Sequence, residues 1–130
     1  MELLHWQWSK YSDTHTNRLN LVIHLVTTPV FDAALMLLPF AVAVGWWLLA
    51  GLAIALLPLV VGLQGYGHAH ESRAPVPFKD PLDAMARIVA EQLITFPRFV
   101  LSGGCRRAWQ GEGHARCTER SIPNHAQGRS

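Results

Sequence analysis

One long apolar run constrains the fold of this chain more than any other feature of its sequence. Residues 33–63, AALMLLPFAVAVGWWLLAGLAIALLPLVVGL, are thirty-one consecutive positions without a charged, amide or hydroxyl side chain. As one α-helix rising about 1.5 Å per residue, the run would measure roughly 46 Å, whereas the hydrocarbon core of a bilayer is about 30 Å thick. The run must therefore fold back on itself.

The expected point of reversal is Gly45, in the sequence GWW. Glycine permits the backbone conformations that a tight turn needs, and tryptophan is typical of the interface between lipid and water. We therefore predict two membrane spans, at about residues 20–44 and 46–67, joined by a hairpin turn.

The overall composition also favours a membrane protein. Half of the 130 residues are apolar and only 15% are charged, which is a low charge content for a soluble domain. The alternative is that the two segments form the buried helical hairpin of a soluble bundle. The interruptions by Asp32, Pro39 and Pro58 leave this alternative open.

The positions of the basic residues predict the orientation of the spans. Nine of the eleven Lys and Arg residues lie from Arg73 onward, and the other two, Lys10 and Arg18, precede the first span. Because positive residues mark the cytoplasmic side, we expect both termini in the cytoplasm. The formal net charge of +2 gives no case for nucleic-acid binding, since basic residues beside a membrane have an ordinary role near lipid headgroups.

The chain beyond the second span should form one more helix and a tail. Prolines at positions 75, 77 and 81 predict an extended linker. Asp80 or Pro81 can then begin an amphipathic helix through LDAMARIVAEQLI, which would lie on the membrane or pack against the hairpin. From Arg106 onward the sequence is rich in Gly, Arg, Gln and Ser, as in a disordered tail.

These elements define the expected fold class. It is all-α, a small integral membrane helical bundle with a transmembrane hairpin, an amphipathic third helix and a disordered C-terminal tail. We expect residues 1–105 to form the membrane-embedded domain and residues 106–130 to form the cytoplasmic tail.

Polar residues within membrane segments are costly, so they are functional candidates by default. The first group lies in HTNRLNLVIH, at the start of the first span. Asn20 and His24 are four residues apart, about 40° on a helical wheel, and share a face. His15 is nine residues before His24, about 180° away if both were helical. We therefore expect His15 to lie in the segment before the helix and to fold in over it.

The second group lies in QGYGHAHE, at the end of the second span. Gln64, His68 and Glu71 fall within a sector of about 60°, whereas His70 points nearly the opposite way. A hairpin that closes at Gly45 would bring this group beside the first, at the same membrane face.

Together the two groups predict a metal site. Neutral imidazole and carboxylate suit iron, zinc or manganese, so the expected ligands are His15, His24, His68 and Glu71. Asn20 and Gln64 would orient these ligands from outside the first coordination shell. The alternative for Glu71 is a solvated side chain or an ion pair with Arg73. On the third helix, Glu91 would be either polar support for the site or a solvated surface residue.

The same residues carry a resemblance to a known family. The pattern H-x4-N-x3-H, then an apolar hairpin and QGYGHAHESRAP, resembles the small membrane family of 2-hydroxy fatty acid dioxygenases known from yeast. The sequence EQLITFPRFVLSGG is similar to that of the family's bacterial branch, long described as a domain of unknown function. The resemblance covers about residues 5–109. The fungal members have one more residue between the GH pair and the glutamate, so the match extends less closely to Glu71.

The resemblance implies an iron(II)-dependent enzyme that uses O2 to shorten 2-hydroxy fatty acids by one carbon. In yeast this α-oxidation serves the breakdown of phytosphingosine at the endoplasmic reticulum. Motif matching implies that His15, His24 and His68 are the metal-binding, catalytic histidines and that Asn20 supports them. For a bacterial member, the inner membrane is the expected location. Arg73 or Arg98 would hold the substrate carboxylate.

Two other functional hypotheses remain. One is a non-catalytic membrane protein in which the polar groups hold a structural metal or only hydrogen-bond the hairpin together. The other is a zinc-dependent lipid hydrolase. The H-x-x-H-H boxes of diiron hydroxylases and desaturases are absent from the sequence, which favours a single metal ion.

Overall fold

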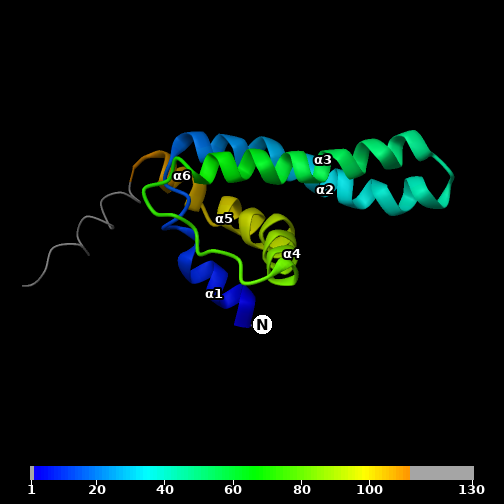
Figure 1. Cartoon of the computed structure of the whole chain (residues 1–130). Coiled ribbons are helices and arrows are strands. Elements are labelled where there is room, and N and C mark those ends of the chain that lie inside the picture. Colours follow the sequence, from blue (N-terminus) through cyan, green and yellow to red (C-terminus); the bar gives the residue numbers. More distant parts are fainter. Residues whose placement is uncertain (1, 112–130) are drawn as a thin grey trace, which may run out of the picture.

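The computed structural model describes residues 2–111 as an arrangement of helices in which no strand occurs (Figure 1). Helices α2 (Arg18–Ala43) and α3 (Trp47–His68) form a long antiparallel hairpin. The turn between them contains Gly45 with a φ of 74°, a left-handed conformation that favours glycine. The predicted hairpin and its point of reversal are therefore confirmed.

Both hairpin helices are long and apolar enough to cross a membrane. The tip of the hairpin extends beyond the other helices (Figure 1), so its apolar side chains are uncovered. Trp47 and Leu48, for example, are 70% and 81% exposed. Such a surface is costly in water but suits hydrocarbon, which fits the predicted membrane hairpin better than the core hairpin of a soluble bundle.

The remaining helices lie near the base of the hairpin, which is the end at which α2 begins and α3 ends (Figure 1). Helix α1 (Glu2–Tyr11) precedes the hairpin, and a linker after α3 leads to α4 (Pro81–Ala90). Asp80 caps α4 by accepting a hydrogen bond from the backbone N–H of Asp83, as the sequence predicts for this helix start.

Helix α4 continues without a break into a π-helical segment, η1 (Glu91–Thr95), and then into α5 (Phe96–Leu101). A small apolar core joins this segment to α1, α2 and α6 (Gly104–Trp109). Its members are Tyr11, Leu21, Phe96, Phe99 and Ala108. The third helix thus packs against the base of the hairpin, which was one of its two predicted positions.

The boundary expected between residues 105 and 106 falls inside α6. Ala108 in that helix is buried in the core, so the folded part extends at least to Trp109. The rest of the predicted tail, residues 112–130, lies outside the described residues.

Candidate metal centre

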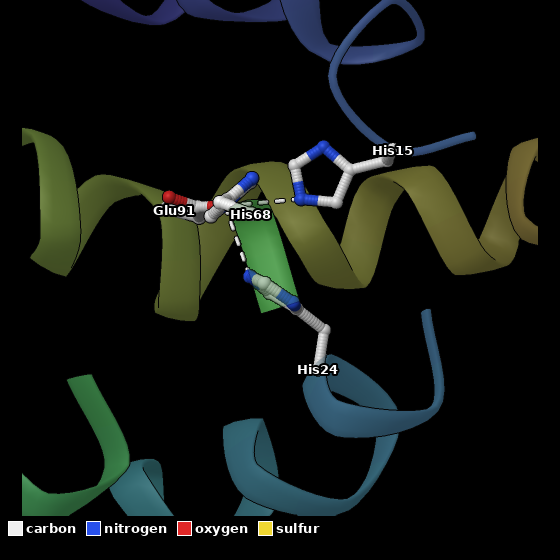
Figure 2. A group of neighbouring side chains, drawn as sticks. All are labelled: His15, His24, His68 and Glu91. Carbon is white, nitrogen blue, oxygen red and sulfur yellow. Dashed lines mark ion pairs between the residues drawn. The ribbon is translucent and has the colours of Figure 1, made fainter. Parts of the chain in front are cut away.

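Three imidazoles from separate elements meet at the base of the hairpin (Figure 2). His24 lies on α2 and His68 ends α3, whereas His15 lies in the loop before α2, as the nine-residue spacing predicts. The ring centroids of the three side chains are 4.8 to 5.0 Å apart. The hairpin therefore brings together the two histidine-containing groups of the sequence.

The carboxylate that joins the three imidazoles is that of Glu91, the first residue of η1. Its Oε1 lies 3.3 Å from Nε2 of His15, 3.5 Å from Nε2 of His24 and 3.9 Å from Nε2 of His68. One ligand atom from each of the four residues lies within 4.8 Å of the others. Short π-helical segments inside α-helices are frequent at functional sites, and here the segment begins at Glu91 itself.

Backbone carbonyls fix the orientation of two of the imidazoles. Nδ1 of His15 lies 3.1 Å from the carbonyl oxygen of Tyr11, and Nδ1 of His24 lies 3.0 Å from that of Asn20. A carbonyl oxygen can only accept, so Nδ1 carries the ring proton in both neutral imidazoles. The lone pair of each Nε2 then faces the centre, which is the arrangement of metal-binding histidines.

The two Nε2 atoms are buried and have no hydrogen-bond partner within the described part of the chain. Orphaned buried polar atoms are rare in folded proteins. Two nitrogen lone pairs directed at a carboxylate oxygen repel it unless a proton or a metal cation lies between them. The residues present therefore fit a bound metal ion.

The electrostatic environment favours the ligand forms of these side chains. Burial lowers the pKa of His15 below its ordinary value, although the neighbouring Glu91 carboxylate opposes this effect. For Glu91 itself, burial raises the pKa, but contacts with the three imidazoles outweigh it and hold the pKa well below its ordinary value. A neutral imidazole and an ionised carboxylate are the states that bind a metal.

Glu71, the predicted fourth ligand, is not in this cluster. Its carboxylate accepts hydrogen bonds from the backbone N–H groups of Thr16 and Asn17, each at 3.0 Å, and from the Thr16 hydroxyl at 2.8 Å. The helical-wheel argument for Glu71 is wrong because α3 ends at His68, so Glu71 lies beyond the helix. The structure instead places Glu71 at the start of α2, where an anion complements the helix dipole.

Hydrogen bonding also sets the protonation of Glu71. Burial raises its pKa, but hydrogen bonds from the Asn20 side chain and from Asn17 and Thr16 outweigh burial. The pKa of Glu71 is therefore below its ordinary value.

Asn20 connects this capping group to the cluster. Its Nδ2 donates to Glu71 Oε1 at 2.8 Å and to the carbonyl oxygen of Thr14 at 3.2 Å, and it lies 3.4 Å from Nδ1 of His68. The close approach of α3 at this point needs Gly67, because a Cβ there would lie 2.6 Å from Asn20 Oδ1. These contacts fit the supporting role expected for Asn20.

Gln64 lies in a second buried polar group. Its Nε2 donates to Oε1 of Gln92 at 3.1 Å and to the Thr27 hydroxyl at 3.0 Å, and the amide of Gln92 donates back to it. Gln64 therefore joins η1 to both hairpin helices next to Glu91. In the described part of the chain it makes no hydrogen bond to the four residues of the cluster, and it would influence them only by fixing the position of η1.

A cavity of about 400 Å³ opens beside the cluster. His15, His68 and Glu91 form part of its wall. Aliphatic and aromatic residues of α3 and the linker after it form much of the apolar wall, and Trp6 and Tyr11 of α1 add to it; the former are Val61, Ala69, Ala74, Pro75, Val76 and Phe78. The cavity thus combines potential metal ligands with an apolar surface.

The basic residues at the cavity differ from those predicted. Arg73 pairs with Asp13 at 3.1 Å, and the Arg98 guanidinium lies 4.2 Å from the ring centroid of Trp8. Neither arginine lines the cavity, whereas Lys10 and Arg87 do.

The fold and the site together define a class, small helical membrane proteins with a candidate metal centre of three histidines and one glutamate. Within this class the chain belongs to the Mpo1-like family, whose model, described as 2-hydroxy-palmitic acid dioxygenase Mpo1-like, matches residues 1–94. The match includes all four residues of the cluster and confirms the resemblance seen in the sequence motifs. No curated protein and no solved structure matches the chain.

Proposed function

We propose that the chain is a non-haem iron(II)-dependent dioxygenase that shortens 2-hydroxy fatty acids by one carbon. The observation that carries this proposal is the convergence of His15, His24, His68 and Glu91 beside a partly apolar cavity, in a chain of this family. The overall conversion balances with one O2, since the 2-hydroxy acid and O2 yield the acid one carbon shorter, CO2 and water.

The four side chains would hold the iron, with Glu91 rather than Glu71 as the carboxylate ligand. Imidazole nitrogens and one carboxylate oxygen suit Fe(II), and four protein ligands leave positions on a six-coordinate metal for substrate and O2. When bound, the iron would supply the activation of O2 that organic side chains cannot provide. The protein's own part is to hold the four ligands, orient the substrate and limit access of water.

The cavity supports an amphiphilic acid as substrate. The 2-hydroxyl and carboxylate would lie near the ligand cluster, and the acyl chain would follow the apolar wall formed by Val61, Val76 and Phe78. Lys10 is the better partner for the carboxylate, because the Arg87 guanidinium already donates to the carbonyl oxygens of Val76 and Pro77. An ammonium on the cavity wall would favour acids over neutral 2-hydroxy lipids.

We further propose that the centre lies at the cytoplasmic face of the membrane. The cluster lies at the base of the hairpin, the end at which the chain enters α2 and leaves α3 (Figure 1). The positive residues of the sequence favour the cytoplasm for that side, and in a bacterial cell the bilayer would be the inner membrane. The substrate's acyl chain could then remain among lipid while its polar end reaches the ligands.

The purified full-length chain, loaded with ferrous iron and supplied with 2-hydroxypalmitate and O2, should release pentadecanoate. His68→Ala should abolish the product, and His70→Ala is the matched control. His70 lies two residues away and is exposed, and within the described residues its side chain hydrogen-bonds only to the carbonyl oxygen of Tyr66. Equal product from wild type and His68→Ala would reject the enzymatic proposal. Metal analysis that finds zinc in place of iron would favour a hydrolase instead.

A further inference from the structure

Tyr11, the last residue of α1, makes contacts with the cluster that the proposed chemistry has not used. We propose that Tyr11 is a positioning residue that fixes two metal ligands, Glu91 and His15, and so makes α1 part of the metal centre. This inference rests on the proposed ligand set, and it concerns how the ligands are held before the metal binds.

Tyr11 touches the two ligands in three ways. Its hydroxyl donates to Oε1 of Glu91 at 3.0 Å, and its backbone carbonyl oxygen lies 3.1 Å from Nδ1 of His15. Its ring stacks on the imidazole of His15, with centroids 3.9 Å apart and an interplanar angle of 18°. Only 3% of Tyr11 is exposed, so all three contacts are shielded from water.

These are the two ligands that most need support from outside their own element. His24 and His68 are carried by the long helices of the hairpin, whereas His15 lies in a loop. Stacking and the carbonyl contact together hold both the plane and the rotation of its ring. Glu91 has a longer, more flexible side chain, and the Tyr11 hydroxyl bonds to Oε1, the same oxygen that faces the three Nε2 atoms, so the hydrogen bond limits the positions that this oxygen can take.

Tyr11 is itself held firmly enough for this role. Its ring packs edge-on against Phe99 of α5, with centroids 5.2 Å apart, and both belong to the small apolar core. One turn earlier on α1, Gln7 donates to the carbonyl oxygen of Arg87 at 3.1 Å and accepts from the Thr95 hydroxyl at 3.3 Å. Helix α1 is therefore docked on α4 and η1 by the same face that carries Tyr11.

A thermodynamic consequence follows from this arrangement. A metal that binds the docked form and not the undocked form must stabilise the docked form. Metal binding should then protect the backbone of residues 2–11, even though α1 supplies no ligand. Tyr11 would be the residue that links metal binding to the docking of α1.

The test uses the full-length chain in detergent micelles, with Co(II) as a spectroscopic substitute for iron. Tyr11→Phe keeps the ring and removes the hydroxyl, and we expect it to weaken Co(II) binding about 10- to 100-fold, the usual cost of losing an outer-shell partner. Its ligand-field absorption should also shift, because Glu91 is no longer oriented. Tyr66→Phe is the matched control, since Tyr66 is exposed and packs against His70 outside the cluster.

Hydrogen exchange provides a second measurement that needs no variant. Addition of Co(II) should slow the exchange of the amides of residues 2–11 in the wild-type chain, and Tyr11→Leu should lose most of this effect. Wild-type affinity and spectrum in Tyr11→Phe, or no change in exchange of α1, would reject the role of Tyr11 while leaving the metal site intact. Failure of the wild-type chain to bind Co(II) at all would instead reject both proposals.

Discussion

The two ends of the hairpin are built from the same two helices, yet they differ in which side chains are exposed and which are buried. At the tip, apolar side chains such as Leu48 and Trp47 are exposed, and no polar side chain lies between residues 33 and 63. At the base, His15, Asn20 and His24 have no accessible surface. The chain therefore places its apolar residues outward where lipid can surround them, and its polar residues inward where other helices cover them.

The difference shows what α1, η1 and α5 contribute. Two helices alone cannot enclose a polar cluster, because each buried polar group needs a hydrogen-bond partner and further elements must cover the open sides of the pair. At the base those partners come from Glu91 and Gln92 of η1 and from Tyr11 of α1. The base and the tip therefore differ in a way that substitutions can test: polar side chains at the base have defined hydrogen-bond partners, whereas large apolar side chains at the tip, such as Leu48, are exposed.

Replacement of Glu91 should have the largest effect. Glu91→Gln removes the only carboxylate of the cluster, and we expect metal affinity to fall at least about 100-fold, beyond the cost of losing an outer-shell partner. Product formation from the 2-hydroxy acid should be lost with it. Glu71→Gln is the matched control and should keep most of the metal affinity, which competition with a chelator would measure. The reverse result would make Glu71 the ligand.

The next effect concerns the apolar core of the base. Leu21 is fully buried among aromatic residues, so Leu21→Ala should lower the free energy of unfolding by about 2–5 kcal/mol. Leu48→Ala at the tip removes a side chain that is 81% exposed and leaves no cavity in the protein. When both variants are unfolded in the same micelles, the free energy of unfolding should fall strongly for Leu21→Ala and hardly at all for Leu48→Ala. Equal losses would mean that the tip is packed against protein.

Gly67→Ala should have an intermediate effect on the contact between the hairpin helices. The added Cβ would lie 2.6 Å from Asn20 Oδ1 and 3.3 Å from the Asn20 Cα, so backbone as well as side chain must move. Overpacking of this kind costs about 1–3 kcal/mol, and the shift of Asn20 should also weaken metal binding. Gly65→Ala, two residues earlier, meets no atom within 4 Å and should leave both unfolding and metal titration unchanged. A neutral Gly67→Ala would show that the helices are further apart than described.

Much of this contrast could be predicted from the sequence. The uninterrupted apolar run requires a hairpin, and the nine-residue spacing of His15 and His24 excludes their lying on one helix face. Family motifs and helical geometry agree on the three histidines. These inferences need only the spacing of residues, which the sequence gives directly, and the thickness of a bilayer, which is the same for any chain.

The choice of carboxylate could not be predicted in the same way. A helical wheel places Glu71 beside His68 only if α3 continues past its last turn, and nothing in the sequence GHAHES marks the end at His68. Glu91 depends on how the third helix docks and on the π-helical segment that begins there, neither of which follows from periodicity. The available signal in the sequence was the polar pair Glu91 and Gln92, which interrupts the apolar stretch IVAEQLI.

The smallest effect should be the pH dependence carried by Glu71. Its pKa is held below the ordinary value of 4.5 by hydrogen bonds that exist only in the folded chain, so the folded state binds the proton less readily than the unfolded state. The stabilisation is therefore fully present above the ordinary pKa and is lost as the pH falls through the folded value. Wild type should melt at a higher temperature than Glu71→Gln at neutral pH, and the gap should narrow as the pH falls below about 4.5. Because the side chain is partly open to solvent, screening keeps this gap small, and a gap that widens in acid would place Glu71 in a different environment from the cap of α2.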